Sequence, residues 1–145
     1  MKDSQYEIST DPSRLDIALI HEFLSSTYWA ANIPRGVVEK SIRHSLCFGA
    51  FSRDRQVGFA RVITDFATLA YLADVFVIAE HRGRGIAKML TGAVLRHPDL
   101  QGVKRFLLAT RDAHKLYAQF GFEPLAHPDY LMTFQPSNVA PGSGR

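Results

Sequence analysis

The segment from Arg82 to Ala87 combines residue types that bind anions. It reads Arg-Gly-Arg-Gly-Ile-Ala and lies between an apolar run that ends at Ile78 and a helical pattern that begins near Ile86. Glycines at a strand-to-helix turn leave backbone N–H groups free at the positive end of the helix dipole. The arginines and Lys88 add attraction for negative charge. The pattern favours a diphosphate site, although an ordinary tight turn with surface arginines has the same glycine spacing.

Two widespread phosphate-binding loops are excluded by their spacing. The chain has no G-x-x-x-x-G-K-[ST] segment and no G-x-G-x-x-G that opens an early strand-helix-strand unit. A nucleoside triphosphatase and a dinucleotide-dependent dehydrogenase are therefore not favoured.

Asp74 is an acidic residue inside an otherwise apolar strand. An ionised carboxylate is costly there unless it is paired or solvated in a cleft. Asp74 is therefore either a functional carboxylate or a partner in a cap or salt bridge. Cys47 lies in another apolar strand without a matched histidine, which favours a buried structural thiol over an acyl-cysteine nucleophile.

A mixed sheet with helices is predicted to position these residues. The patterns predict strands at 6–9, 46–51, 57–63, 68–78, 105–109 and 130–134, and helices at 11–26, 34–45, 86–97 and 112–120. Asp11 is expected to cap the first helix, and Val37, Val38 and Ile42 to anchor the second. Residues 75–78 are apolar without alternation, so their strand is predicted to be central.

Length and charge favour one domain with a small anionic ligand. We expect residues 1–135 to form this domain, and residues 136–145, which have little to bury, to form a flexible tail. The formal charge is +3, and the Lys and Arg residues are dispersed, so nucleic-acid binding is only weakly supported.

Cysteine and hydropathy patterns indicate the compartment. The single cysteine excludes an internal disulfide, and neither Cys nor His shows metal-ligand spacing, so no metal is expected and the histidines are expected at the solvated surface. No apolar run approaches the roughly 18 residues of a membrane span. We therefore expect a cytoplasmic protein without a membrane partner.

The glycine loop also resembles a family motif. Arg82, Gly85 and Ala87 match the R/Q-x-x-G-x-G/A motif of the GNAT family of N-acetyltransferases. The strand 74–77, the helix start 88–90 and the pair Leu116-Tyr117 with Phe120-Gly121-Phe122 resemble further parts of that family. The resemblance covers about residues 6–134. It implies a single-domain mixed α/β fold whose central sheet is splayed between strands 4 and 5 and flanked by about four helices.

The resemblance implies acetyl-CoA as the donor, bound where the sheet splays. The pantetheine arm would pair with the fourth strand, and the loop would hold the pyrophosphate mainly through backbone amides. Thr110 stands where the family often carries an asparagine that reaches the cofactor, so its hydroxyl would replace that amide only partly. The implied cofactor-binding residues are Phe76, Val77, Arg82, Gly83, Arg84, Gly85, Ile86, Ala87, Lys88 and Thr110.

Two residues are implied to be catalytic. The family transfers acetyl directly to an amine in a ternary complex, and Tyr117 resembles the tyrosine that protonates the CoA thiolate. The alternative for Tyr117 is a core tyrosine. Asp74 resembles the acidic residue that faces the acceptor amine in small-molecule members, where it can act as a base through water. The glutamate of polyamine-acetylating members is replaced by Ala73.

The acceptor side is less determined. Tyr28, Trp29 and Arg35 occupy a connection that in this family forms one wall of the acceptor site, although core packing explains the two aromatic residues equally well. The compact chain favours a small primary amine. Two alternatives remain: the acceptor is a protein amine, or the protein is an acetyl-CoA sensor without catalysis. Because members of the family are frequently dimers, a homodimer is also expected.

Overall fold

A computed structural model describes residues 5–136, and in this part of the chain five strands form one mixed sheet. The order is β1-β2-β3-β4-β5, with antiparallel pairing up to β4 and parallel pairing between β4 and β5. The predicted mixed sheet is thereby confirmed, and β4 is an interior strand between β3 and β5 rather than the central one. The strands are β1 (Glu7–Ser9), β2 (Leu46–Ser52), β3 (Arg55–Thr64), β4 (Ala70–Val77) and β5 (Phe106–Leu108).

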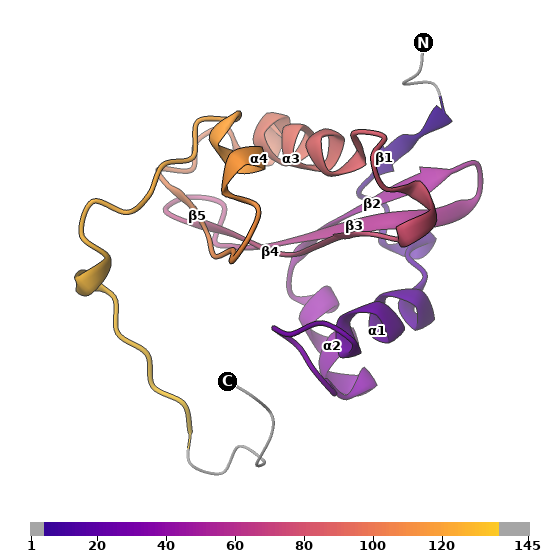
Figure 1. Ribbon diagram of the computed structural model, residues 1–145, viewed down its shortest axis with the longest axis horizontal. Helices are drawn as coiled ribbons and strands as arrows, with labels where there is room; N and C mark the ends of the chain where they lie inside the picture. Colours follow the sequence, from indigo (N-terminus) through magenta and orange to yellow (C-terminus); the bar gives the residue numbers. More distant parts are fainter. Residues whose placement is uncertain (1–4, 137–145) are drawn as a thin grey trace.

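Helices cover both faces of this sheet. Figure 1 shows α1 and α2 on one side and α3 and α4 on the other, which is the expected α/β arrangement. The helices are α1 (Ile17–Ser25), α2 (Arg35–Arg43), α3 (Ile86–Arg96) and α4 (His114–Ala118). None of the helices in residues 5–136 is both long enough and apolar enough to cross a bilayer.

The core lies on both faces of β4. On one face the Phe76 ring stacks on Phe23 of α1, with centroids 4.1 Å apart. On the other face α3 buries Ile86, Leu90 and Val94. Because both faces are covered, the end of β4 needs the continuous apolar run that its sequence shows.

The first helix begins later than its sequence predicts. Asp11 caps only a 3-10 turn, Pro12–Arg14, and α1 starts at Ile17 with Asp16 as its cap, whose Oδ1 accepts from the Leu19 amide at 3.0 Å. Buried Gln56 causes the delay, because its Oε1 accepts the Asp16 N–H at 2.7 Å and holds the chain before the helix. This contact spans 40 residues.

Two further predictions are wrong. No strand forms at 130–134; the 3-10 turn Pro128–Tyr130 is followed by a segment outside the sheet. In α2, Val38 is buried while Val37 is half exposed, because only one side of this short helix faces the core. Of the expected tail 136–145, all but Pro136 lies outside the described residues.

Candidate active site

The site begins where β4 separates from β5. The two strands pair only from Ala70 to Leu72. Just beyond, a bulge against β3 inserts Asp74 in the left-handed region, with φ of 57°. Aspartate tolerates this conformation better than most residues with a side chain, and a bulge bends its strand. The bend leaves the β4 edge from Val75 to Val77 unpaired on the side of β5.

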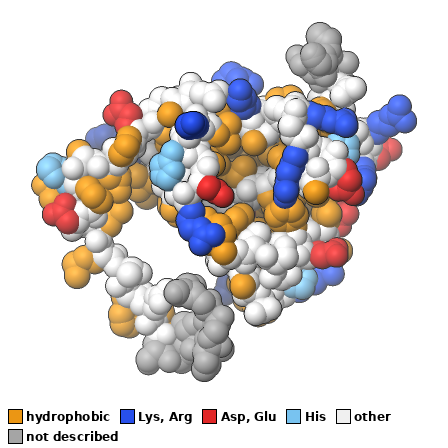
Figure 2. Space-filling model, viewed as in Figure 1, with side chains coloured by type: hydrophobic (Ala, Val, Ile, Leu, Met, Phe, Trp, Pro, Cys, Tyr) orange, Lys and Arg blue, Asp and Glu red, His pale blue; other side chains and the backbone are white. Residues whose placement is uncertain are grey.

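A cleft of about 700 Å³ lies along this free edge. It runs between the end of α1 with its following loop, the glycine loop before α3, and α4. Hydrophobic side chains gather in the middle of the face seen in Figure 2, with Lys and Arg side chains around them. The lining residues are Phe23, Ser26, Thr27, Tyr28, Trp29, Val75, Phe76, Val77, His81, Arg82, Gly83, Gly85, Ile86, Ala87, Lys88, Ala113, Leu116 and Tyr117.

The glycine loop presents free amides to the cleft. Gly83 and Gly85 have φ of 80° and 81°, angles that glycine adopts without strain. The Met89 amide makes the first backbone bond of α3, to the Gly85 carbonyl at 3.0 Å. The amides of residues 86–88 make no backbone hydrogen bond within the described residues, so they remain available to an anion at the helix N-terminus.

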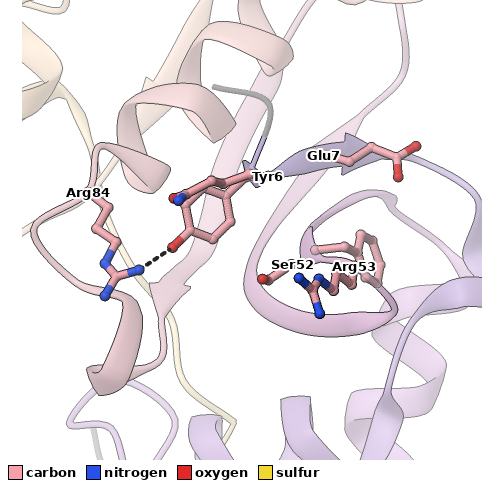
Figure 3. A pocket seen from close by; sticks show the side chains of 7 residues that line it. Tyr6, Glu7, Ser52, Arg53 and Arg84 are labelled. Atoms are coloured by element: carbon pink, nitrogen blue, oxygen red, sulfur yellow. Dashed lines mark hydrogen bonds between the residues drawn. The ribbon is translucent and has the colours of Figure 1, made fainter. Parts of the chain in front are cut away.

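The loop arginines have different surroundings. Arg82 lines the cleft, and its Nε donates to the Val77 carbonyl at 3.0 Å. Arg84 points away: its Nη1 donates to Tyr6 Oη at 3.2 Å beside a separate hollow of about 610 Å³, as Figure 3 shows. Tyr6 Oη also lies 2.8 Å from Nδ1 of His81. The loop is thus tied to the end of β4 and to the chain just before β1.

Tyr117 reaches the cleft from α4. The residue is 7% exposed, and its ring packs edge-on against Phe122. Burial raises the pKa of the Tyr117 phenol above its ordinary value, so the hydroxyl stays protonated at neutral pH. Thr110 does not line the cleft; its Oγ1 accepts the Ala113 amide at 3.0 Å and holds the turn that starts α4.

Asp74 does not line the cleft and lies in a partly buried ion pair. Its Oδ2 is 2.8 Å from Nε of Arg61, and its Oδ1 accepts from Nε1 of Trp29 at 2.9 Å. The side chains of Arg61 and Asp74 are 16% and 10% exposed, and Arg61 also donates to Ser45 Oγ at 3.1 Å. Sequence reasoning missed Arg61; the signal was an arginine within the apolar strand before Asp74.

The predicted acceptor residues separate into two groups. Tyr28 and Trp29 line the cleft and contact each other edge to face, with centroids 5.1 Å apart. Arg111, which sequence reasoning did not single out, stacks on the Tyr28 ring at 3.7 Å. Arg35 instead pairs with Glu39 along α2, at 3.2 Å, and does not line the cleft.

Cys47 lies outside the cleft, whereas His81 belongs to its lining. Burial raises the pKa of Cys47 to about 12. The thiol is therefore buried and unreactive, as the sequence predicts. His81 lines the cleft and is partly buried, so the expectation of a solvated surface histidine is wrong for this residue, which Tyr6 draws inward. Residues 5–136 contain no group of three or more His, Cys, Asp or Glu side chains that could hold a metal.

A splayed sheet with a glycine loop at its opening is typical of CoA-dependent acyltransferases. Residues 15–122 match the sequence model of the Acetyltransferase (GNAT) family. The chain therefore belongs to this family and is an N-acetyltransferase, as the motifs at Arg82–Ala87 and Leu116–Phe122 indicate.

Relatives agree with this assignment. A crystal structure from Xanthomonas campestris pv. campestris, of a candidate GNAT acetyltransferase, shares 58% identity at a TM-score of 0.87 and covers 90% of this chain and 93% of its own. A candidate acetyltransferase of Gibberella zeae is 32% identical over 79% of this chain and 76% of its own length. An acetyltransferase structure from Clostridium acetobutylicum that contains acetyl-CoA shares the fold, with 13% identity, a TM-score of 0.66 and coverage of 90% and 94%.

Proposed function

We propose that this enzyme transfers acetyl from acetyl-CoA directly to the primary amine of a small molecule, in a ternary complex. One observation carries the proposal: a single cleft contains the glycine loop, the free edge of β4 and the buried Tyr117. A donor and an acceptor can therefore meet in one space without a covalent enzyme intermediate. The buried thiol of Cys47, with its high pKa, also argues against such an intermediate.

The cleft fits acetyl-CoA, the donor that the family uses. The amides at the start of α3 would hold the pyrophosphate, with Arg82 and Lys88 as nearby cations. The edge of β4 at Phe76 and Val77, which β5 does not cover, would pair with the pantetheine arm, mainly through the Val77 amide because the Val77 carbonyl already accepts from Arg82. Arg84 and Thr110, whose side chains are engaged elsewhere, would contribute through the loop backbone and the α4 turn respectively.

The proposed chemistry requires two proton transfers. The neutral amine attacks the thioester carbonyl, the C–N bond forms and the C–S bond breaks. Tyr117, protonated because its pKa is raised, gives its proton to the departing thiolate and regains one from solvent. The proton lost by the amine passes through water to Asp74 and then to solvent. Each Asp74 oxygen accepts one hydrogen bond from protein, which leaves room for water as well.

The cleft lining supports a small acceptor of low positive charge. The described lining residues include no Asp or Glu, and Asp74, behind Trp29, is already paired with Arg61. A polyamine would find little counter-charge there, whereas one amine on an aromatic or uncharged body suits Tyr28 and Trp29. A homodimer and a cytoplasmic location remain part of this proposal.

An assay of CoA release over a panel of amines tests the proposal. The panel contains aromatic monoamines, amino acids, aminoglycosides, polyamines and peptides, and a thiol reagent detects CoA without background from buried Cys47. We expect release with small monoamines and little with polyamines. Release with peptides alone would identify a protein acceptor. Thermal stabilisation by acetyl-CoA without release for any amine would identify a sensor.

A further inference from the structure

Arg111 links two segments that border the cleft. Its Cζ lies 3.7 Å from the centroid of the Tyr28 ring, which lines the cleft from the loop after α1. Arg111 itself belongs to the loop between β5 and α4, and it lies beside the lining residues rather than among them. The contact therefore fixes a cation at the border of the cleft.

This contact lies toward the end of the cleft that is remote from the glycine loop. Tyr28 packs against Trp29, whose Nε1 donates to Asp74 at 2.9 Å. Asp74 precedes the free β4 edge, Val75–Val77, whereas the glycine loop follows it. The donor phosphates are proposed to bind at that loop, so the position of Arg111 suits the acceptor instead.

The guanidinium of Arg111 is oriented before any ligand binds. A guanidinium that lies over an aromatic ring keeps its N–H donors in its own plane, where they remain accessible from the side. The turn that carries Arg111 is closed by Thr110, whose Oγ1 accepts the Ala113 amide at 3.0 Å. Because both ends of the side chain are held, a ligand needs to order little on binding.

No carboxylate of the described chain occupies these donors. The ion pairs within residues 5–136 leave Arg111 out. Its neighbour Asp112 is exposed, joins none of these pairs and does not line the cleft. Arg61, by contrast, already pairs with Asp74 at 2.8 Å. Arg111 therefore leaves the acceptor end of the cleft with a positive charge that an anion from outside the chain would balance.

We propose that Arg111 binds a carboxylate of the acceptor, so that the substrate is an amine that also carries a carboxylate. This inference rests on the proposed function and narrows its acceptor class. One planar guanidinium matches a carboxylate through two parallel N–H···O bonds, whereas a phosphate dianion suits a set of backbone amides such as the glycine loop. The amine would point toward Tyr117 while the carboxylate stays beside Tyr28.

Matched pairs of acceptors test the preference for a carboxylate. The pairs are phenylalanine with phenylalaninamide, and para-aminomethylbenzoate with para-aminomethylbenzamide, which cover a short and a long spacing between amine and acid. For wild type we expect kcat/KM, corrected for the neutral fraction of each amine, to be at least about tenfold higher for the acid in one or both pairs. No preference in either pair, or a preference for the amides, would overturn the proposal.

Substitution of Arg111 tests the residue itself. Arg111→Met keeps an apolar stem against Tyr28 and removes the charge. We expect kcat/KM to fall by about 10–100-fold for the preferred acid and to stay within about threefold for its amide, with partial recovery in Arg111→Lys. Arg43→Met is the matched control, because Arg43 is exposed at the end of α2 and outside the cleft, and it should behave as wild type. Equal losses for acid and amide would show that Arg111 only supports Tyr28, which would overturn the proposal.

Binding measurements separate this inference from the proposed function. Acetyl-CoA affinity should be the same in wild type and Arg111→Met; a tenfold loss would assign Arg111 to a donor phosphate and overturn the proposal. If no amine is acetylated, the proposed function fails, but calorimetry on CoA-saturated protein still measures binding of the same acids and amides. Binding of an acid that is lost in Arg111→Met would support the inference. Equal binding of acids and amides, or none, would contradict it.

Discussion

Tyr117 carries the most direct catalytic prediction. Tyr117→Phe keeps the ring that packs against Phe122 and removes only the hydroxyl in the cleft. We expect turnover to fall by about 10–1000-fold, a somewhat wider range than ordinary acid–base contributions, with little change in acetyl-CoA affinity. Steady-state kinetics and calorimetric binding measure the two quantities. Unchanged turnover would remove Tyr117 from the mechanism.

The pKa of Tyr117 predicts a pH dependence for the same residue. Its pKa is raised by burial, so the protonated acid persists beyond the ordinary phenol pKa of about 10. Turnover should therefore show no alkaline fall from Tyr117 below that pH. A fall that begins near pH 8 and disappears in Tyr117→Phe would contradict the assignment of Tyr117 as a protonated acid.

Asp74 and Arg61 allow structural and catalytic roles to be separated. Asp74→Asn and Arg61→Met both break the same partly buried ion pair, and removing one partner of a fully buried pair costs about 3–5 kcal/mol, so a smaller loss is expected here. We expect both variants to lose stability in urea titrations. Only Asp74→Asn removes the carboxylate, so turnover per folded enzyme should fall further in that variant. Equal losses of turnover would assign Asp74 to positioning Trp29 rather than to accepting a proton.

At the scale of elements, the glycine loop is tested by a pair of alanine substitutions. Gly85 has φ of 81°, and a Cβ there would meet no atom within 4 Å. Gly85→Ala should therefore lower the free energy of unfolding by about 1–2 kcal/mol, because alanine is strained in the left-handed backbone conformation. The distorted loop should also weaken acetyl-CoA binding. Gly36→Ala, in α2 and equally open, should instead stabilise by roughly 0.5–1 kcal/mol. Denaturation curves and acetyl-CoA titrations measure both effects; wild-type affinity in Gly85→Ala would contradict the role of the loop.

Elements were predictable where their signals are local. The apolar run of β4, the periodicity of α3 and the left-handed Gly121 after α4, with φ of 97°, each depend on a few adjacent residues. The start of α1 was not predictable, because Gln56 fixes the Asp16 amide from a distant strand. Residues 130–134 have the composition of a strand but find no strand partner within the described residues, so their local preference alone was misleading.

At the scale of the whole molecule, Cys47 reports on opening of the core. Its pKa of about 12, against 9.0 for an unperturbed thiol, means about 1000-fold less thiolate at pH 8 in the folded chain. Thiol reagents should therefore label Cys47 at least that much more slowly in native protein than in denaturant. The thiol contribution to stability is complete below pH 9 and is lost as the pH rises toward 12. Equal labelling rates in native and denatured protein would contradict the burial.

The sequence by itself predicted the part of the cleft that is proposed to bind the acetyl donor. The glycine loop, the strand before it and the Tyr117 signature are contiguous patterns, and backbone preferences within such patterns depend mainly on near neighbours. Tertiary structure alone decided the pairing of Asp74 with Arg61 and Trp29, the hydrogen bond from Arg84 to Tyr6 and the exposure of residues 130–134. The hydrogen bonds among these residues join positions that are 13 to 78 residues apart in the sequence. The position of Asp74 also depends on the bulge between β3 and β4. No local pattern encodes such long-range geometry, because it arises only when the sheet and helices pack together.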